Sequence, residues 1–466
     1  MTTTLLFDDH RLNRIFNVIR KLGQPKRIDD AIYRDTYGDI SYGYPTVFWN
    51  EKSGTWRMVY QTAVNPPEKF AQVLAESSNG LQWSPRDTSM EVDLSERLLL
   101  HQVVPVEENM EWGSCFVDEL AEPRERIKAF QISFPKGIAG GGRAVLLVSP
   151  DGLRWRRKEK GAWLKFGGDP GIFAFWNEVR QSYVILTRHE VLDRRIAAVE
   201  TTDWIHYSDP ELVVHPDGLD SPLTEPYGMA VLPYSGYYIG FLWLFHPVPW
   251  DPSIRRFRGG HIDCQLVYSL NGWHWHRGLR DPFIPNGNPG EPDSGCVYPG
   301  SVVVQADGSL LIYASACTHE HGVPPKGSGS IVVYWLRRDG FCYLESCGGI
   351  GLVGMRPIYW CDGEVELNVS SQGGSARAQV TDQVGTPLDG FTFEDCKPFS
   401  GDDTAWSPEW RSGKRMGSLR GQFIRVEVEL NSARLYAIRG EYVETMPMAI
   451  ARHRAYGEIP SSRIGW

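Results

Sequence analysis

Residues 77–83 read S-S-N-G-L-Q-W, and four later stretches of the chain repeat this turn motif. The later copies are S-P-D-G-L-R-W (149–155), T-T-D-W-I-H-Y (201–207), S-L-N-G-W-H-W (269–275) and R-R-D-G-F-C-Y (337–343). The third copy lacks the glycine, and the fifth lacks the small polar residue. Asn-Gly and Asp-Gly pairs supply the positive φ of a tight turn, and the aromatic residue then re-enters a strand. The copies begin 72, 52, 68 and 68 residues apart, which indicates a repeated supersecondary unit.

A second pattern precedes each turn motif and has the same phase. It consists of two runs of β-branched and aromatic residues around a short turn, and it covers residues 45–61, 113–131, 172–188, 227–243 and 298–315. Such runs predict a hairpin. Each repeat therefore has an inner hairpin and an outer hairpin, which together make a four-stranded propeller blade. Five repeats predict a five-bladed β-propeller. The alternative, one large sandwich with accidental turn similarities, does not explain why two independent patterns share one phase.

The rest of the chain predicts a second domain. The five repeats fill roughly residues 1–352 of 466. In residues 353–466, four segments alternate apolar and polar residues between Gly- and Asp-rich turns, at 364–369, 376–380, 423–430 and 433–439. This alternation is typical of an antiparallel β-sandwich. The predicted fold class is all-β, with a propeller at 1–352 and a sandwich at 353–466. Residues 1–40 precede the first repeat, and we expect them to pair with the last blade and close the ring.

Composition restricts the partners. The chain has 17 Trp, 20 Tyr and 19 Phe, which suits both packing between blades and stacking on sugars. Its net charge of −9 argues against a nucleic-acid partner. The eight cysteines lack metal-type C-x-x-C spacing, and no apolar run is long enough to span a bilayer. We therefore expect a cytoplasmic protein with no membrane partner. It could form a homo-oligomer.

An acidic residue stands before every inner hairpin. These acids are Asp39, Glu111, Asp169, Glu225 and Asp293. The inner strands of a propeller begin at the mouth of its central funnel, so we expect these carboxylates to converge. Carboxylates that lie close together repel one another, so their pKa values separate. One can then carry a proton while its neighbour stays ionised, and glycoside hydrolysis requires this combination of proton donor and ionised carboxylate. The alternative is that individual acids cap turns through backbone N–H groups.

Other polar and aromatic residues occupy corresponding strand ends. Arg188, His246 and His321 end the second strands of the third, fourth and fifth repeats. Together with Glu111 and Trp176 they are the predicted substrate-binding residues, Trp176 by stacking on a sugar or else by packing between blades. The stretch H-E-H at 319–321 lacks the H-E-x-x-H spacing of a catalytic zinc site, so no metal site is predicted. No cofactor is expected, although a structural cation could lie on the propeller axis.

These motifs resemble those of a known enzyme group. The S-x-[DN]-G-x-x-W stretches, the F-W-N-E hairpins, the acids before the inner strands and the C-terminal sandwich resemble five-bladed propeller glycoside hydrolases. The nearest resemblance is to glycoside hydrolase family 32, with family 43 as a relative. It covers nearly the whole chain. However, the family 32 motif W-M-N-D-P-N-G and the E-C motif are absent, and R-D-P occurs only at 280–282, outside the second repeat. The three catalytic acids of the family have only approximate equivalents in this chain. The resemblance implies Asp39 for the first, Glu111 or Asp118 for the second, and Asp169 or Glu225 for the third.

The sequence therefore predicts hydrolysis or transfer at a glycosidic bond, with fructo- and arabinofuranosides as candidate substrates. Asp39 is expected to act as nucleophile or base and Glu225 as general acid. Asp169 and Asp293 would orient the reacting groups or set their pKa, and Arg188 would hold the substrate. The main alternative is a carbohydrate-binding propeller without catalysis, because fold does not fix function. A phosphorylase-like transfer, with Arg143 and Arg188 at a phosphate site, is a third hypothesis.

Overall fold

Strands dominate the computed structural model of the chain. It describes residues 1–64, 69–94, 98–104, 110–133, 143–158, 171–190, 194–248, 259–322, 328–371, 373–445 and 447–460. Within these ranges the single α-helix is α1 (Pro447–Tyr456). The short 3₁₀ turns are η1 (Asp29–Ala31), η2 (Pro123–Glu125) and η3 (Met416–Leu419). The prediction of an all-β chain is confirmed. Among these residues, no helix combines the length and the apolar character needed to cross a membrane.

The chain divides into two compact units. The repeat unit comprises Pro25–Gln305 and Leu310–Trp335, and the terminal unit comprises Met1–Gln24, Ala306–Ser309 and Leu336–Trp466. This division differs from the expected boundary at residue 352. The reason is strand pairing, because the first residues of the chain and those after Trp335 form backbone hydrogen bonds with C-terminal strands.

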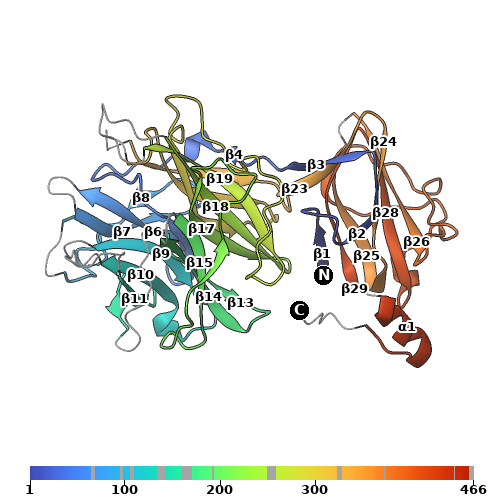
Figure 1. Ribbon diagram of the computed structural model, residues 1–466, viewed down its shortest axis with the longest axis horizontal. Helices are drawn as coiled ribbons and strands as arrows, with labels where there is room; N and C mark the ends of the chain where they lie inside the picture. The colour runs from blue at the N-terminus through green and yellow to red at the C-terminus, as the bar shows by residue number, and fades with distance from the viewer. Residues whose placement is uncertain are drawn as a thin grey trace. The chain divides into compact units, whose positions relative to one another are not determined.

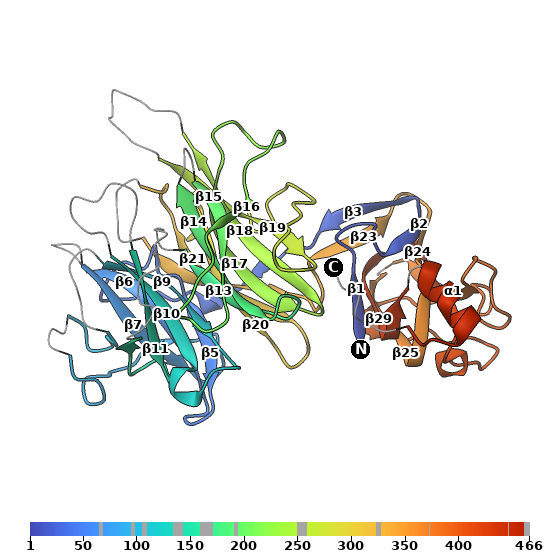
Figure 2. The ribbon, with the colours of Figure 1, turned by 60° about the horizontal axis from the view of Figure 1, so that its bottom comes forward.

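The first three repeats of the repeat unit each form a separate antiparallel sheet of four strands (Figures 1 and 2). The first sheet has β5 (Thr46–Asn50), β6 (Thr55–Val64), β7 (Lys69–Ser77) and β8 (Ser84–Pro85). The second has β9 (Met110–Val117), β10 (Ile127–Ser133), β11 (Arg143–Ser149) and β12 (Arg156–Arg157). The third has β13 (Phe173–Asn177), β14 (Ser182–Glu190), β15 (Arg194–Thr201) and β16 (Glu211–Val214). The predicted inner and outer hairpins are thus present in these repeats.

The fourth and fifth repeats share one seven-stranded sheet. Its strands, in order, are β17 (Glu225–Tyr234), β18 (Tyr237–Pro247), β19 (Gly260–Ser269), β20 (Cys296–Val304), β21 (Leu310–Cys317), β22 (Ser330–Leu336) and β4 (Lys26–Arg27). A single parallel pair, Ile262 with Cys296, joins the two repeats. The N-terminal strand β4 pairs with β22 and so completes the last repeat. Pairing between the residues before the first repeat and the last repeat was predicted, and it is confirmed.

The first strands of the five repeats are neighbours in a cycle. β5 contacts β9, β9 contacts β13, β13 contacts β17, β17 contacts β20, and β20 contacts β5. Buried apolar clusters fill the space between successive sheets: one joins the first and second repeats, others join the second to the third and the third to the fourth, and another joins the fifth to the first. This cyclic packing brings the beginnings of the first strands into one region.

The turn motifs explain how the outer hairpins are held. In the second copy, Ser149 Oγ accepts a hydrogen bond from the Gly152 N–H at 2.9 Å, and Asp151 Oδ1 accepts one from Leu153 at 3.0 Å. The first and fourth copies repeat both contacts. The third copy also repeats both contacts but places Trp204, at φ 59°, where the others have glycine. A left-handed conformation is unfavourable for a residue with a Cβ, so tertiary packing must stabilise this turn.

The terminal unit contains strands from both ends of the chain. They are β1 (Thr2–Leu5), β2 (Leu12–Phe16), β3 (Val18–Leu22), β23 (Cys342–Ser346), β24 (Ile350–Met355), β25 (Ile358–Ser370), β26 (Ser375–Asp382), β27 (Asp402–Trp406), β28 (Phe423–Asn431) and β29 (Arg434–Glu444), all in one sheet. The four segments with alternating residues fall within β25, β26, β28 and β29. The fifth turn motif also lies in this unit, where Asp339 rather than the following glycine has positive φ and pairs with Arg439.

Replacing Trp204 with glycine tests whether packing or backbone strain dominates at the third turn. Trp204 is 4% exposed and its ring centroid lies 4.6 Å from that of Tyr183, with the Lys128 ammonium 5.2 Å from the ring. Loss of a buried tryptophan costs about 3–5 kcal/mol, whereas relief of the left-handed conformation returns about 1–2 kcal/mol. Trp204→Gly should therefore lower the free energy of unfolding by about 1–4 kcal/mol in urea titrations.

The control for this experiment is Gly54→Ala. Gly54 has φ 62°, and an added Cβ there would meet no atom within 4 Å, so this variant measures the backbone cost alone. A Trp204→Gly protein more stable than the wild type would show that strain, not packing, dominates at this turn.

Candidate functional site

Three tyrosines from different repeats surround one histidine. The hydroxyls of Tyr42 and Tyr298 lie 3.2 and 3.3 Å from His321 Nδ1, and the Tyr227 hydroxyl lies 3.2 Å from Nε2. Tyr42 precedes β5, Tyr227 and Tyr298 lie near the beginnings of β17 and β20, and His321 follows β21. The His321 backbone N–H also donates to the Gly260 carbonyl at 2.8 Å. We call these four side chains the tyrosine–histidine cluster.

Local strand irregularities direct these side chains. In β17, Pro226 pairs with Leu244 and Gly228 with Trp243, so Tyr227 is the extra residue of a β-bulge. β20 has a corresponding irregularity between Pro299 and Ser301. A bulge changes the side-chain alternation of a strand and re-aims a residue. The first strands therefore present tyrosines to one another at the point where they meet.

Two arginines border the cluster. The Arg188 guanidinium lies 4.5 Å from the centroid of the Tyr227 ring, and that of Arg194 lies 5.2 Å from the same ring. Arg194 Nη1 also forms an ion pair with Glu225 Oε2 at 2.5 Å. Burial, followed by the nearby positive charges of Arg194 and Arg188, lowers the pKa of His321 to about 3. The imidazole is therefore neutral near pH 7, and it acts as a hydrogen-bonding group rather than as a cation.

Two of the predicted acids stand close in the sequence to tyrosines of this cluster. Asp39, three residues before Tyr42, is half-buried, and its Oδ1 accepts hydrogen bonds from the Ser41 N–H at 3.1 Å and from the Gly329 N–H at 3.2 Å. Glu225, two residues before Tyr227, pairs with Arg194. Arg188 and His321, both predicted as substrate-binding residues, lie in the same region. Glu225 and two guanidinium groups therefore border the aromatic rings of the cluster, and Asp39 precedes one of its tyrosines by three residues.

The remaining predicted acids lie elsewhere or outside the described residues. Asp293 is 2% exposed, and its carboxylate binds Arg27 Nη1 at 2.5 Å and accepts a hydrogen bond from the Tyr334 hydroxyl. Those partners belong to β4 and β22, the outer strands of the fifth repeat. Asp118 forms a buried pair with Lys128 at 2.6 Å. Asp169 lies outside the described residues, as do the side chains of Glu111 and Arg143.

Two predicted substrate-binding residues have other neighbours. Trp176 in β13 is half-buried and packs edge-on against Tyr183 of the same sheet, with ring centroids 4.9 Å apart. Trp176 also packs against the apolar cluster between the second and third repeats, which corresponds to the packing alternative that was considered for it. His246 ends β18 and lies 3.1 Å from Asp263 Oδ2. It therefore belongs to a separate group on the fourth repeat.

Sequence reasoning missed the tyrosines and Arg194. A signal was present, because three of the five acidic segments also contain a tyrosine: D-I-S-Y at 39–42, E-P-Y at 225–227 and D-S-G-C-V-Y at 293–298. The distance from acid to tyrosine differs among the three segments, so no fixed spacing marked the pattern.

Comparison with known proteins gives structural neighbours only. No protein-family model matches the chain, and no curated protein matches it. A solved structure described as a glycoside hydrolase is 13% identical, with 68% of this chain and 92% of that chain aligned and a TM-score of 0.45. A thermostable family-43 glycoside hydrolase is 14% identical, with 69% and 95% aligned and a TM-score of 0.43.

A third neighbour is an N-acetylgalactosamine deacetylase from F. plautii in complex with blood group B trisaccharide. It is 13% identical, with 67% of this chain and 94% of that chain aligned and a TM-score of 0.44. Glycoside hydrolases, the group that the sequence motifs resemble, are thus among the solved structures similar to this chain. At these identities and TM-scores, the comparisons assign neither family nor activity to it.

The neutral state of His321 predicts how stability depends on pH. The pKa of His321 is about 3 in the folded protein, whereas the ordinary value of a histidine side chain is 6.5. The contribution of this group to stability is therefore fully present above pH 6.5 and is lost as the pH falls toward 3. His321→Gln should remove this dependence, so its free energy of unfolding should vary less with pH in that window than that of the wild type.

Urea unfolding at a series of pH values measures this difference. The control is His206→Gln, at an exposed position on the third turn. Equal pH dependence in wild type and His321→Gln would contradict the assignment of a neutral, buried imidazole.

Proposed function

We propose that the repeat unit is a five-bladed β-propeller whose funnel opens at the tyrosine–histidine cluster. The cyclic contacts β5–β9–β13–β17–β20–β5 support this arrangement. In this proposal the seven-stranded sheet represents two blades joined by one parallel pair. The terminal unit would be an accessory β-sandwich.

We further propose that the chain hydrolyses or transfers glycosidic bonds at this cluster. The observation that carries the proposal is that Glu225, through Arg194, and Arg188 border a cluster of tyrosines from separate repeats, one of which, Tyr42, follows Asp39 by three residues. Glycoside hydrolysis uses two carboxylates on opposite sides of the scissile bond, and Asp39 and Glu225 come from the first and fourth repeats. Sugars bind to aromatic faces and to charged hydrogen-bonding groups, both of which are present.

The roles follow from the partners of each residue. Asp39 would act as nucleophile or base, and its Oδ1 is already oriented by two backbone N–H groups. Glu225 would act as general acid, which requires that substrate binding displace Arg194 from the ion pair so that the carboxyl group can carry a proton. Arg188 would hold a sugar hydroxyl or carboxylate. Asp293, bound to Arg27 and Tyr334, would stabilise the fifth repeat instead of contacting the sugar.

Amide variants separate these roles. Glu225→Gln and Asp39→Asn should each lower kcat by about 10²–10⁴-fold, because acid–base groups contribute that range. The measurement is release of the aryl group from aryl furanosides and pyranosides, with fructo- and arabinofuranosides tested first. Asp293→Asn should mainly lower the melting temperature, since it breaks a buried ion pair.

Melting curves of all three variants provide the control for folding. Full turnover in both Glu225→Gln and Asp39→Asn would reject the catalytic assignment.

A second candidate function is carbohydrate binding without catalysis. It is favoured by the engagement of Glu225 with Arg194, which occupies a carboxylate that a hydrolase would need free to act. Calorimetric binding of oligosaccharides to the wild type, with no aryl-glycoside turnover, would select this function over hydrolysis.

A further inference from the structure

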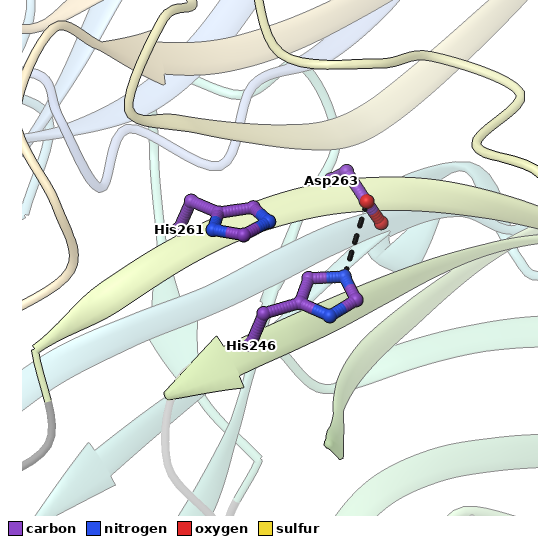
Figure 3. Close-up of side chains that lie close together, drawn as sticks. All are labelled: His246, His261 and Asp263. Carbon is purple, nitrogen blue, oxygen red and sulfur yellow. Dashed lines mark hydrogen bonds and ion pairs between the residues drawn. The ribbon is translucent and has the colours of Figure 1, made fainter. Parts of the chain in front are cut away.

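Two histidines and an aspartate share one face of the fourth repeat. β18 and β19 pair in antiparallel register, with His246 directly opposite His261. Asp263 follows His261 by two positions, and residues two apart on a strand point to the same side of the sheet. The register therefore brings the three side chains together on adjacent strands (Figure 3).

The donor atoms of these residues are close to one another. One donor atom from each residue lies within 4.8 Å of the other two. His246 Nε2 is 3.1 Å from Asp263 Oδ2, and the two imidazole rings are stacked with centroids 4.6 Å apart. Figure 3 shows both rings beside the carboxylate, with the dashed line marking the contact to His246.

A simple His–Asp hydrogen bond does not satisfy the whole carboxylate. Asp263 is 6% exposed, and among the described residues Oδ1 is buried without a hydrogen-bond partner. A buried polar atom that lacks a partner is destabilising, and more so if it is charged. Such an atom in a native structure needs an explanation, and an absent ion is one of the recognised explanations. A cation bound to the carboxylate would supply the missing partner.

The chemistry of the three residues favours a particular class of cation. Imidazole nitrogen suits Zn²⁺, Cu²⁺, Ni²⁺ and Fe²⁺, whereas Ca²⁺ and Mg²⁺ prefer oxygen ligands. Bonds of about 2.1 Å in a tetrahedral site would place the donor atoms about 3.4 Å apart. The present cluster is wider, and the exposed side chain of His261 would have to rotate inward to complete the site. Three protein ligands would leave a coordination position open to water or substrate.

We propose that His246, His261 and Asp263 bind a divalent transition-metal cation of the Zn²⁺ class. The site is separate from the tyrosine–histidine cluster, although Gly260, next to His261, accepts the hydrogen bond from the His321 backbone. The proposal does not depend on glycosidase activity, because it rests on the ligand set and the buried carboxylate oxygen alone.

Metal titration of the full chain tests the proposal directly. After chelator treatment and dialysis, the protein is titrated with ZnCl₂ by calorimetry and with CoCl₂ by visible absorption. The wild type should bind about one equivalent at this site. His261→Ala and Asp263→Asn should each weaken binding by about 100-fold or more, since even the loss of an outer partner costs 10–100-fold. Zn²⁺ should raise the melting temperature of the wild type but not of His261→Ala.

The matched control is His206→Ala. His206 Nδ1 lies 2.7 Å from Asp203 Oδ2, so it forms an exposed His–Asp pair of the same kind outside the three-residue group. This variant should bind Zn²⁺ as the wild type does. Because His261 is exposed, we expect His261→Ala to fold. This variant therefore tests metal binding even if Asp263→Asn fails to fold. The proposal is overturned if the wild type binds neither Zn²⁺ nor Co²⁺, if His261→Ala binds them unchanged, or if Ca²⁺ binds more tightly than Zn²⁺.

Discussion

A buried, neutral imidazole connects three repeats at one point. His321 has two ring nitrogens, and the hydroxyls of Tyr42, Tyr227 and Tyr298 all lie within hydrogen-bonding distance of them. A hydrogen bond of this kind contributes about 1 kcal/mol, but a buried hydroxyl left without a partner costs more. The ring therefore constrains where the first strands of separate repeats begin. Burial, together with the repulsion that a protonated ring would meet from Arg194 and Arg188, lowers the pKa of His321 and keeps the ring neutral.

Most of the fold could be predicted because its determinants are local. The turn motif is only seven residues long and contains all of its determinants. They are a left-handed turn residue, a side-chain acceptor two or three positions earlier and a following aromatic residue. The same local rule fails where tertiary context decides. The fifth motif contains the same Asp-Gly pair, yet Asp339 takes the positive φ and its carboxylate is used in a buried pair with Arg439. Assigning that motif to the last blade placed the boundary between the units too late in the chain.

The candidate site was harder to predict because it depends on distant partners and on bulges. Three of the segments before the first strands meet at His321, and the side chain that contacts the imidazole in each is a tyrosine rather than the acid named from the sequence. A bulge directs the Tyr227 side chain toward the cluster. One extra residue in a strand exchanges the faces to which the following side chains point, so the simple alternation of side chains does not reveal a bulge. Asp293 is separated from Arg27 by 266 positions. Nothing near Asp293 in the sequence indicates that an arginine on an N-terminal strand neutralises it.

The pair of imidazoles on the fourth repeat and the tyrosine–histidine cluster share one short segment of backbone. Gly260 accepts the hydrogen bond from the His321 N–H, and the next residue, His261, is a proposed metal ligand. A cation held by His261 and Asp263 would fix the beginning of β19 and therefore the carbonyl to which His321 is attached. Its positive charge would be offset by Asp263 and by Glu320, whose charge acts on His261. The metal site would thus restrain His321 through the backbone without adding uncompensated charge beside Arg188 and Arg194.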